Sequence, residues 1–181
     1  MTKAEILAVA KPILFNTEMV QAILDGRKTQ TRRVIKYSCP SRPDQTLDDF
    51  IGDKDPQGLA VYADYHPGDI LWVRETWAKQ FGVYWYKAGP FPDGAVPPDK
   101  WRPSIHMPKE AARIFLRVLS VRTERLQDIT EENARAEGTF YGALIDDSDS
   151  MILAAQDTFP ELWDSTVKPS KRDQYGWSAN P

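Results

Sequence analysis

Two segments with the residue pattern of β-strands set the main limits on the fold of this chain. Residues 113–126, RIFLRVLSVRTERL, alternate apolar and polar side chains, as a half-buried strand does. Residues 70–77, ILWVRETW, are rich in β-branched and aromatic side chains and follow the turn sequence HPGD. The stretch 89–104 between them holds five prolines, which predicts irregular structure there. VYWY, at 83–86, is expected to pair with the 70–77 strand as a hairpin.

The N-terminal part predicts a strand followed by a helix. KPILF, at 11–15, is a short apolar run typical of a strand. Asn16 can then cap a helix that ends at Gly26. The apolar stripe of this helix consists of Met19, Val20, Ile23 and Leu24.

Two further helices are expected after the long strand. Asp128 or Thr130 caps a short helix, ITEENARAE, which Gly138 closes. A longer helix covers about 149–165, and Pro160 kinks or divides it.

The order of these elements predicts an α+β domain around a small, mainly antiparallel or barrel-like sheet. The βαβα alternation and Gly-rich phosphate loop of a nucleotide-binding parallel sheet are missing. At 181 residues the chain is most simply one domain, residues 1–181, with insertions at about 38–66 and 79–104.

Composition excludes several functional classes. No apolar run reaches the ~18 residues of a membrane helix, and the start lacks the pattern of a signal peptide. A single cysteine, Cys39, excludes an intrachain disulfide and is typical of a cytoplasmic protein. Cys39, His66 and His106 are far apart in sequence, so neither a zinc site nor a metal cofactor is expected. The net charge of −3 leaves room for only a local basic groove.

Such a local basic site is present in DGRKTQTRR, residues 25–33. Four cationic residues fall between Arg27 and Arg33 and begin at the predicted end of a helix, where the helix dipole favours cations. Arginine suits forked contacts with phosphate or a base edge. Without further information, a solvated loop with arginines paired to acids is the simpler interpretation.

Three motifs together resemble the ASCH domain family, within the PUA-like superfamily of small RNA-associated β-barrels. They are GRKTQTRR, PGDILWVRETW and LQDITEENARAEG. The motifs WRPSIHMP, at 101–108, and LWDS, at 162–165, make this chain similar to the longer phage and prophage members of the family. The resemblance covers roughly 11–37, 67–78 and 101–177. It implies a PUA-like barrel with flanking helices, a cleft between sheet and helices, and single-stranded RNA or a modified nucleoside as ligand.

The resemblance also implies catalytic residues. One small bacterial branch removes the acetyl group from the exocyclic amine of acetylcytidine, without a cofactor. Its catalytic lysine, threonine and glutamate match Lys28, Thr31 and Glu137. Thr31 would be the nucleophile and Lys28 its base. In an extended strand Lys28 and Thr31 would face opposite sides, so a turn between them is required.

Two opposing effects act on Lys28. Crowding by Arg27, Arg32 and Arg33 lowers the pKa of its ammonium, while the helix end raises it. Glu137 stands just before the expected helix stop, an unfavourable end for a carboxylate unless a cation compensates. Lys28 or Arg33 is the expected cation.

The chain departs from the small enzymes in three respects. Its insertions could roof or fill the cleft. Arg32 stands where the small enzymes tend to be apolar. The sequence ends at YGWSANP, where relatives usually continue into another strand, so one barrel strand is expected to be missing.

Several other side chains are candidate ligand contacts. Arg27, Arg32 and Arg33 would bind the ligand, and Trp77 would form one wall of the site with Arg74 or Glu75 as polar partners. Most tryptophans, including Trp72 and Trp163, are expected in the core.

Three alternatives stand beside an acetylcytidine amidohydrolase. They are a non-catalytic RNA-binding module, a metal-independent ribonuclease, and a phage protein that binds a host protein through its insertions.

Overall fold

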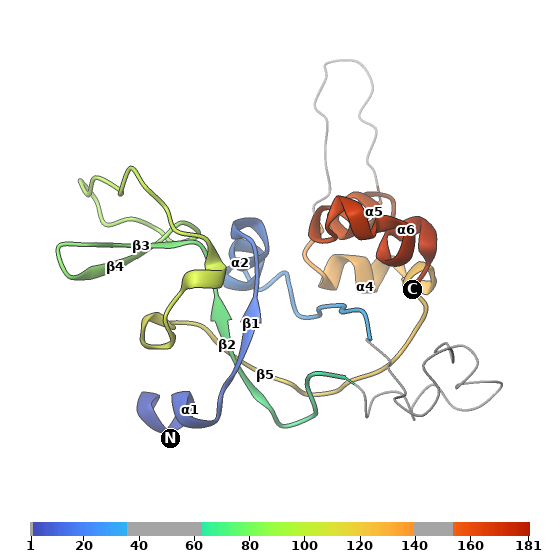
Figure 1. The fold of residues 1–181 in the computed structure, drawn as a ribbon, viewed down its shortest axis with the longest axis horizontal. Helices are drawn as coiled ribbons and strands as arrows, with labels where there is room; N and C mark the ends of the chain where they lie inside the picture. The colour runs from blue at the N-terminus through green and yellow to red at the C-terminus, as the bar shows by residue number, and fades with distance from the viewer. Residues whose placement is uncertain (1, 36–62, 140–153) are drawn as a thin grey trace, which may run out of the picture. The chain divides into compact units, whose positions relative to one another are not determined.

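The computed structural model describes residues 2–35, 63–139 and 154–181, which form two compact units. Unit 1 comprises residues 1–25 and 65–121, and unit 2 comprises residues 26–64 and 122–181. Figure 1 shows the elements of each, and each unit is described by itself below.

A three-stranded sheet forms the centre of unit 1. Its strands are β1 (Lys11–Leu14), β2 (Ile70–Arg74) and β5 (Phe115–Arg117), in the order β1-β2-β5. β1 runs parallel to β2, with Lys11 opposite Leu71, and β5 runs antiparallel to β2, with Leu116 also opposite Leu71. The strand predicted at 11–15 is therefore confirmed as β1.

Two short helices lie on either side of β1 in the sequence. α1 (Lys3–Val9) begins with a capping box between Thr2 and Glu5. α2 (Thr17–Leu24) begins as predicted, because the Asn16 side chain accepts a hydrogen bond from the Met19 amide at 2.8 Å. Of its predicted stripe Met19 and Val20 are buried, whereas Leu24 is exposed; Ala22 is buried instead.

The segment 70–77 is two strands and not one. β2 ends at Arg74, and β3 (Trp77–Gln80) begins three residues later. β3 pairs with β4 (Val83–Tyr86) in an antiparallel hairpin, so 83–86 pairs with the continuation of the predicted strand. Residues 89–103 contain no helix or strand, as their prolines predict, apart from a single bridge between Trp77 and Arg102.

The strand predicted over 113–126 is much shorter. β5 covers only Phe115–Arg117, although backbone hydrogen bonds to Val73 and Asp69 extend the pairing from Ile114 to Val118. Alternation continues beyond that point, but residues 119–125 have no strand partner in the described part of the chain. Alternation alone therefore overestimated the length.

Unit 2 is helical where it is described. Thr130, and not Asp128, caps α4 (Glu131–Ala136), and Gly138 follows it with a positive φ of 88°. α5 (Ala155–Thr166) continues through Pro160 as one helix, and α6 (Arg172–Tyr175) follows. The predicted start of the long helix at 149 and most of the 38–66 insertion lie outside the described residues.

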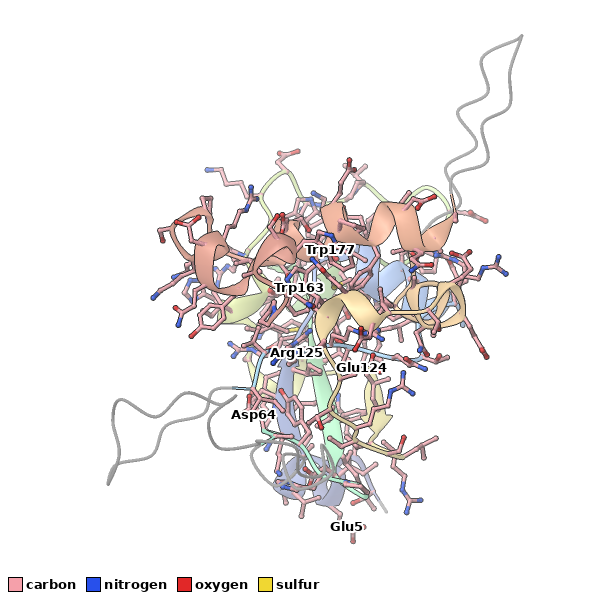
Figure 2. All side chains as sticks on the ribbon, turned by 90° about the vertical axis from the view of Figure 1, so that its right-hand side faces the viewer. Glu5, Asp64, Glu124, Arg125, Trp163 and Trp177 are labelled. Atoms are coloured by element: carbon pink, nitrogen blue, oxygen red, sulfur yellow. The ribbon has the colours of Figure 1, made fainter. Side chains whose placement is uncertain are left out.

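Buried aromatic side chains hold unit 2 together. Phe159 and Trp163 of α5 pack with Leu126, Ile129 and Ala134. Trp177 packs against this cluster, with its ring 6.0 Å from that of Phe159, and Figure 2 labels Trp163 and Trp177 among the side chains. In unit 1, Trp72 packs on Ala10 and Ala112. Trp72 and Trp163 are thus core residues, as predicted.

Five short 3-10 turns complete the described elements: η2 (Ser104–His106), η3 (Lys109–Ala111), η4 (Leu126–Asp128), η5 (Pro169–Lys171) and η6 (Trp177–Ala179). The structure is α+β, as predicted, with one three-stranded and one two-stranded sheet in the described residues and no closed barrel among them. No helix in the described ranges is long and apolar enough to cross a membrane.

Candidate functional site

The basic segment is held against the C-terminal end of α4 within unit 2. The amides of Thr29 and Gln30 both donate to the carbonyl of Ala136, at 2.8 and 2.9 Å. Residues 27–35 belong to no helix or strand. The alternation of an extended strand therefore does not apply to this segment.

Lys28 and Glu137, 109 positions apart, form a buried ion pair. The Lys28 Nζ atom lies 2.7 Å from Glu137 Oε2, and the two side chains are 2% and 5% exposed. Nζ also donates to the backbone carbonyls of Gln30 and Glu137, both at 2.8 Å. These three acceptors match the three N–H donors of an ammonium group. The prediction that a cation compensates Glu137 at the helix end is confirmed, and Lys28 is that cation.

Burial lowers the pKa of Lys28. The neighbouring Glu137 carboxylate raises that pKa, through its charge and its hydrogen bond, and only partly offsets the burial. Arg33 and Arg32 lower the pKa further through like-charge repulsion. The crowding effect expected from the sequence is therefore present for Arg32 and Arg33, two of the three arginines expected to cause it, but burial is the larger cause of the lowered pKa.

This balance gives a pH dependence whose sign can be tested. A lysine with a lowered folded-state pKa binds its proton more weakly in the folded than in the unfolded chain. The stability of unit 2 should therefore rise with pH between that lowered pKa and the unfolded value of about 10.4. Glu137→Gln should lower the pKa of Lys28 further, because it removes the raising charge. Titration of the Lys28 side chain by NMR measures both values, and an unshifted lysine would contradict the prediction.

Arg32 extends the ion pair into a network. It donates to Glu137 Oε1 at 3.2 Å and to the Glu124 carboxylate, and its guanidinium lies 5.6 Å from the ring centre of Phe159. Glu137 thus binds Lys28 with one oxygen and Arg32 with the other. Glu124 was not predicted as a site residue, because it lay in a segment interpreted as a strand.

Thr31 and Arg33 form a second contact beside this network. Arg33 donates to Thr31 Oγ1 and to the Arg32 carbonyl, both at 2.8 Å. Arg33 is exposed and Thr31 partly so. Arg27 donates to the Gly138 carbonyl at 3.4 Å. All five predicted residues of the basic segment therefore lie within unit 2, and Lys28 and Arg32 among them contact Glu137.

The sequence predicted an open cleft, whereas Lys28 and Glu137 form a covered ion pair. Lys28 and Glu137 are almost fully covered, so their charged atoms fill the space between segment and helix end. Thr31, Arg32 and Arg33 lie at the more accessible border of the network.

The other three predicted ligand residues belong to unit 1. Trp77 is 4% exposed and packs on Met107 and Ala111, so it is a core residue and not a wall that a base could stack on. Glu75 is fully buried and receives two hydrogen bonds from Arg113, each 2.8 Å. Arg74 donates to the Ile105 carbonyl and lies over Trp72. The packing of unit 1 explains these contacts. Arg113, the partner of Glu75, was not predicted as a site residue, because nothing in the sequence distinguishes it from the other arginines.

No protein-family model, curated protein or solved structure matches this chain. Within the described residues, no group of three or more His, Cys, Asp or Glu side chains could hold a metal ion.

Proposed function

We propose that this protein is an ASCH-type domain that binds a nucleoside and hydrolyses an acyl-amide on its base, as in acetylcytidine. The observation that supports this most is the buried Lys28–Glu137 pair, whose Lys28 Nζ also donates to the carbonyl of Gln30, the residue before Thr31. In the same proposal the sheets of unit 1 are part of a PUA-like barrel, and the protein works in the cytoplasm.

Lys28 loses its proton more readily than an ordinary lysine, as a general base requires. Its lowered pKa makes the neutral amine, which is the form that can accept a proton, easier to reach than in an exposed lysine. Nζ lies 2.8 Å from the carbonyl of Gln30, which is bonded directly to the nitrogen of Thr31. Glu137 fixes the position of Nζ.

Thr31 is the proposed nucleophile. Its Oγ1 would form a bond to the acyl carbon while its proton passes to Lys28. The C–N bond then breaks, and Lys28 returns the proton to the leaving amine. Water hydrolyses the acyl-threonine and regenerates the hydroxyl. Arg33, which donates to Oγ1 at 2.8 Å, would stabilise negative charge on that oxygen.

Two threonine variants test this mechanism. Thr31→Val keeps the shape and removes the hydroxyl, so we expect loss of acetylcytidine hydrolysis by about 10²–10⁴-fold or more. Thr31→Ser retains a hydroxyl and serves as the matched control, with measurable turnover. Because Thr31 is only partly buried, both variants should melt close to wild type. Equal activity in Thr31→Val and wild type would remove Thr31 from the mechanism.

One observation favours a second candidate, a non-catalytic module that binds single-stranded RNA. Lys28 has three acceptors around Nζ, which an ammonium satisfies and a neutral amine does not. If the lysine stays charged, its role is to hold the basic segment while Arg32 and Arg33 contact phosphate. RNA retention that weakens steeply with salt, with neither deacetylation nor cleavage, would support this candidate. RNA cleavage in EDTA would support a ribonuclease.

A further inference from the structure

Arg32 covers the Lys28–Glu137 pair from the more accessible border of the network. Its Nη1 atom donates to Glu137 Oε1 at 3.2 Å, and its Nη2 atom donates to the Glu124 carboxylate. The side chains of Lys28 and Glu137 are 2% and 5% exposed, and that of Arg32 is 12% exposed. Because Glu137 is almost fully covered and its Oε1 atom contacts Arg32, a ligand can reach this oxygen only by displacing the guanidinium.

The contacts of Arg32 leave it easier to release than Lys28. Its Nε atom is buried and has no hydrogen-bond partner among the residues that the structure describes, which costs stability that release into water would restore. Its 3.2 Å contact with Glu137 is longer than a typical hydrogen bond between charged groups. After release, Glu137 would keep Lys28, and Glu124 would keep Arg122, which lies 3.0 Å from it. Neither carboxylate would therefore be left without a cation.

The surroundings of the guanidinium show what could replace it. The group is flat and lies over the ring of Phe159, with its central carbon 5.6 Å from the ring centre. Its N–H groups are directed at two carboxylates. A planar ring with an N–H donor on its edge offers the same two features, and aromatic side chains stack readily on nucleic-acid bases. Arg32, Glu124, Glu137 and Phe159 all belong to unit 2.

We propose that Arg32 is a displaceable cover, and that its guanidinium occupies the place of a cytosine-type ring. In the bound state the ring lies over Phe159, and its 4-amine donates to Glu137 Oε1. Acetylation of this amine leaves one N–H, which is sufficient for that hydrogen bond. Uracil presents a carbonyl oxygen at the same position, which a carboxylate repels. The choice of cytosine rests on the proposed function, whereas the place of the ring follows from the contacts of Arg32.

Arg32→Ala removes the cover and should strengthen nucleoside binding. The probe is cytidine, which has no acyl-amide to hydrolyse, and equilibrium dialysis measures its affinity. A cover reduces the apparent affinity by the fraction of molecules that are open, so we expect Arg32→Ala to bind cytidine at least about tenfold more tightly than wild type. The same variant should prefer cytidine to uridine by about tenfold. Guanidinium ions, far below denaturing concentrations, should compete with cytidine in Arg32→Ala and not in wild type.

Two further variants control for charge and for folding. Arg122→Ala also removes one cation from the network, but Arg122 pairs with Glu124 and Gln30, so cytidine affinity should not rise. Arg32→Lys keeps a cation between Glu124 and Glu137, which protects the fold. Its ammonium lacks a flat face, so it should be displaced more easily, and its cytidine affinity should lie between those of wild type and Arg32→Ala. If Arg32→Ala does not fold, the comparison of Arg32→Lys with wild type decides.

Four results would overturn the proposal. They are cytidine binding by Arg32→Ala that is no tighter than in wild type, equal affinity of that variant for uridine, the same gain in Arg122→Ala, and no competition by guanidinium. Acetylcytidine hydrolysis is measured separately on wild type and Arg32→Ala. Tight cytidine binding without hydrolysis would contradict the proposed reaction and leave the assigned place of the base intact.

Discussion

Arg113→Ala is expected to destabilise unit 1 by about 3–5 kcal/mol, because it leaves a buried carboxylate without its cation. Glu75 is 1% exposed, and both of its oxygens accept hydrogen bonds from Arg113, each 2.8 Å long. The Arg113 guanidinium also lies 4.2 Å from the ring centre of Tyr86, whose hydroxyl donates to the Ala111 carbonyl. The substitution therefore removes a charge partner and a stacking contact together. Hydrogen exchange of the β2 amides measures the loss within unit 1.

Two further variants separate charge from shape at this position. Arg113→Lys keeps the positive charge but cannot form the planar fork, so it should recover only part of the stability. The double change Glu75→Met with Arg113→Met removes both charges and should be more stable than Arg113→Ala. If Arg113→Ala protected the β2 amides as well as wild type does, the carboxylate would have to be solvated or protonated, and the buried pair would not be the stabilising feature.

The parts of the fold that the sequence predicted well are those specified by neighbouring residues. Asn16 and Thr130 cap helices because a short polar side chain can reach an amide three positions ahead. Gly26 and Gly138 stand just after helices because the backbone there takes a positive φ, which glycine adopts easily. Each of these interactions lies within one helical turn, so its sequence pattern carries the full information.

The lengths of the strands depended on partners that are distant in sequence. Residues 119–125 keep an alternating pattern, but only Phe115–Arg117 have a strand beside them. The 70–77 run breaks at Glu75, whose side chain turns into the interior to meet Arg113. No local pattern distinguishes a buried glutamate from a solvated one, since the difference is made by an arginine 38 positions away.

The same limit applied to the candidate site. Glu137 and the basic segment were brought together correctly, because a carboxylate at a helix C-terminus requires a cation. The sequence could not show that the pair would be covered, nor that Glu124 would share Arg32. Burial is a property of the packed unit, and here it is also the main cause of the lowered pKa of Lys28.

Lys28→Met is expected to destabilise unit 2 by about 3–5 kcal/mol and to remove any activity of the site. Methionine has a similar length, so the change mainly removes the charge. Glu137 would then keep only the longer contact with Arg32, at 3.2 Å. The carbonyls of Gln30 and Glu137 would also lose a donor in a covered position. Hydrogen exchange of the α4 amides measures this loss in unit 2.

A double-mutant cycle tests whether Lys28 and Glu137 act as one pair. Adding Glu137→Met to Lys28→Met removes the stranded carboxylate, and Arg32 retains Glu124 as its acid partner. The double variant should therefore be more stable than the sum of the two single effects predicts, by about 0.5–3 kcal/mol. The double variant should remain inactive even where its stability recovers, because it lacks the amine of Lys28, the proposed base. Strict additivity would mean that Lys28 is held by the two backbone carbonyls alone, and the assignment of Glu137 as its partner would then be wrong.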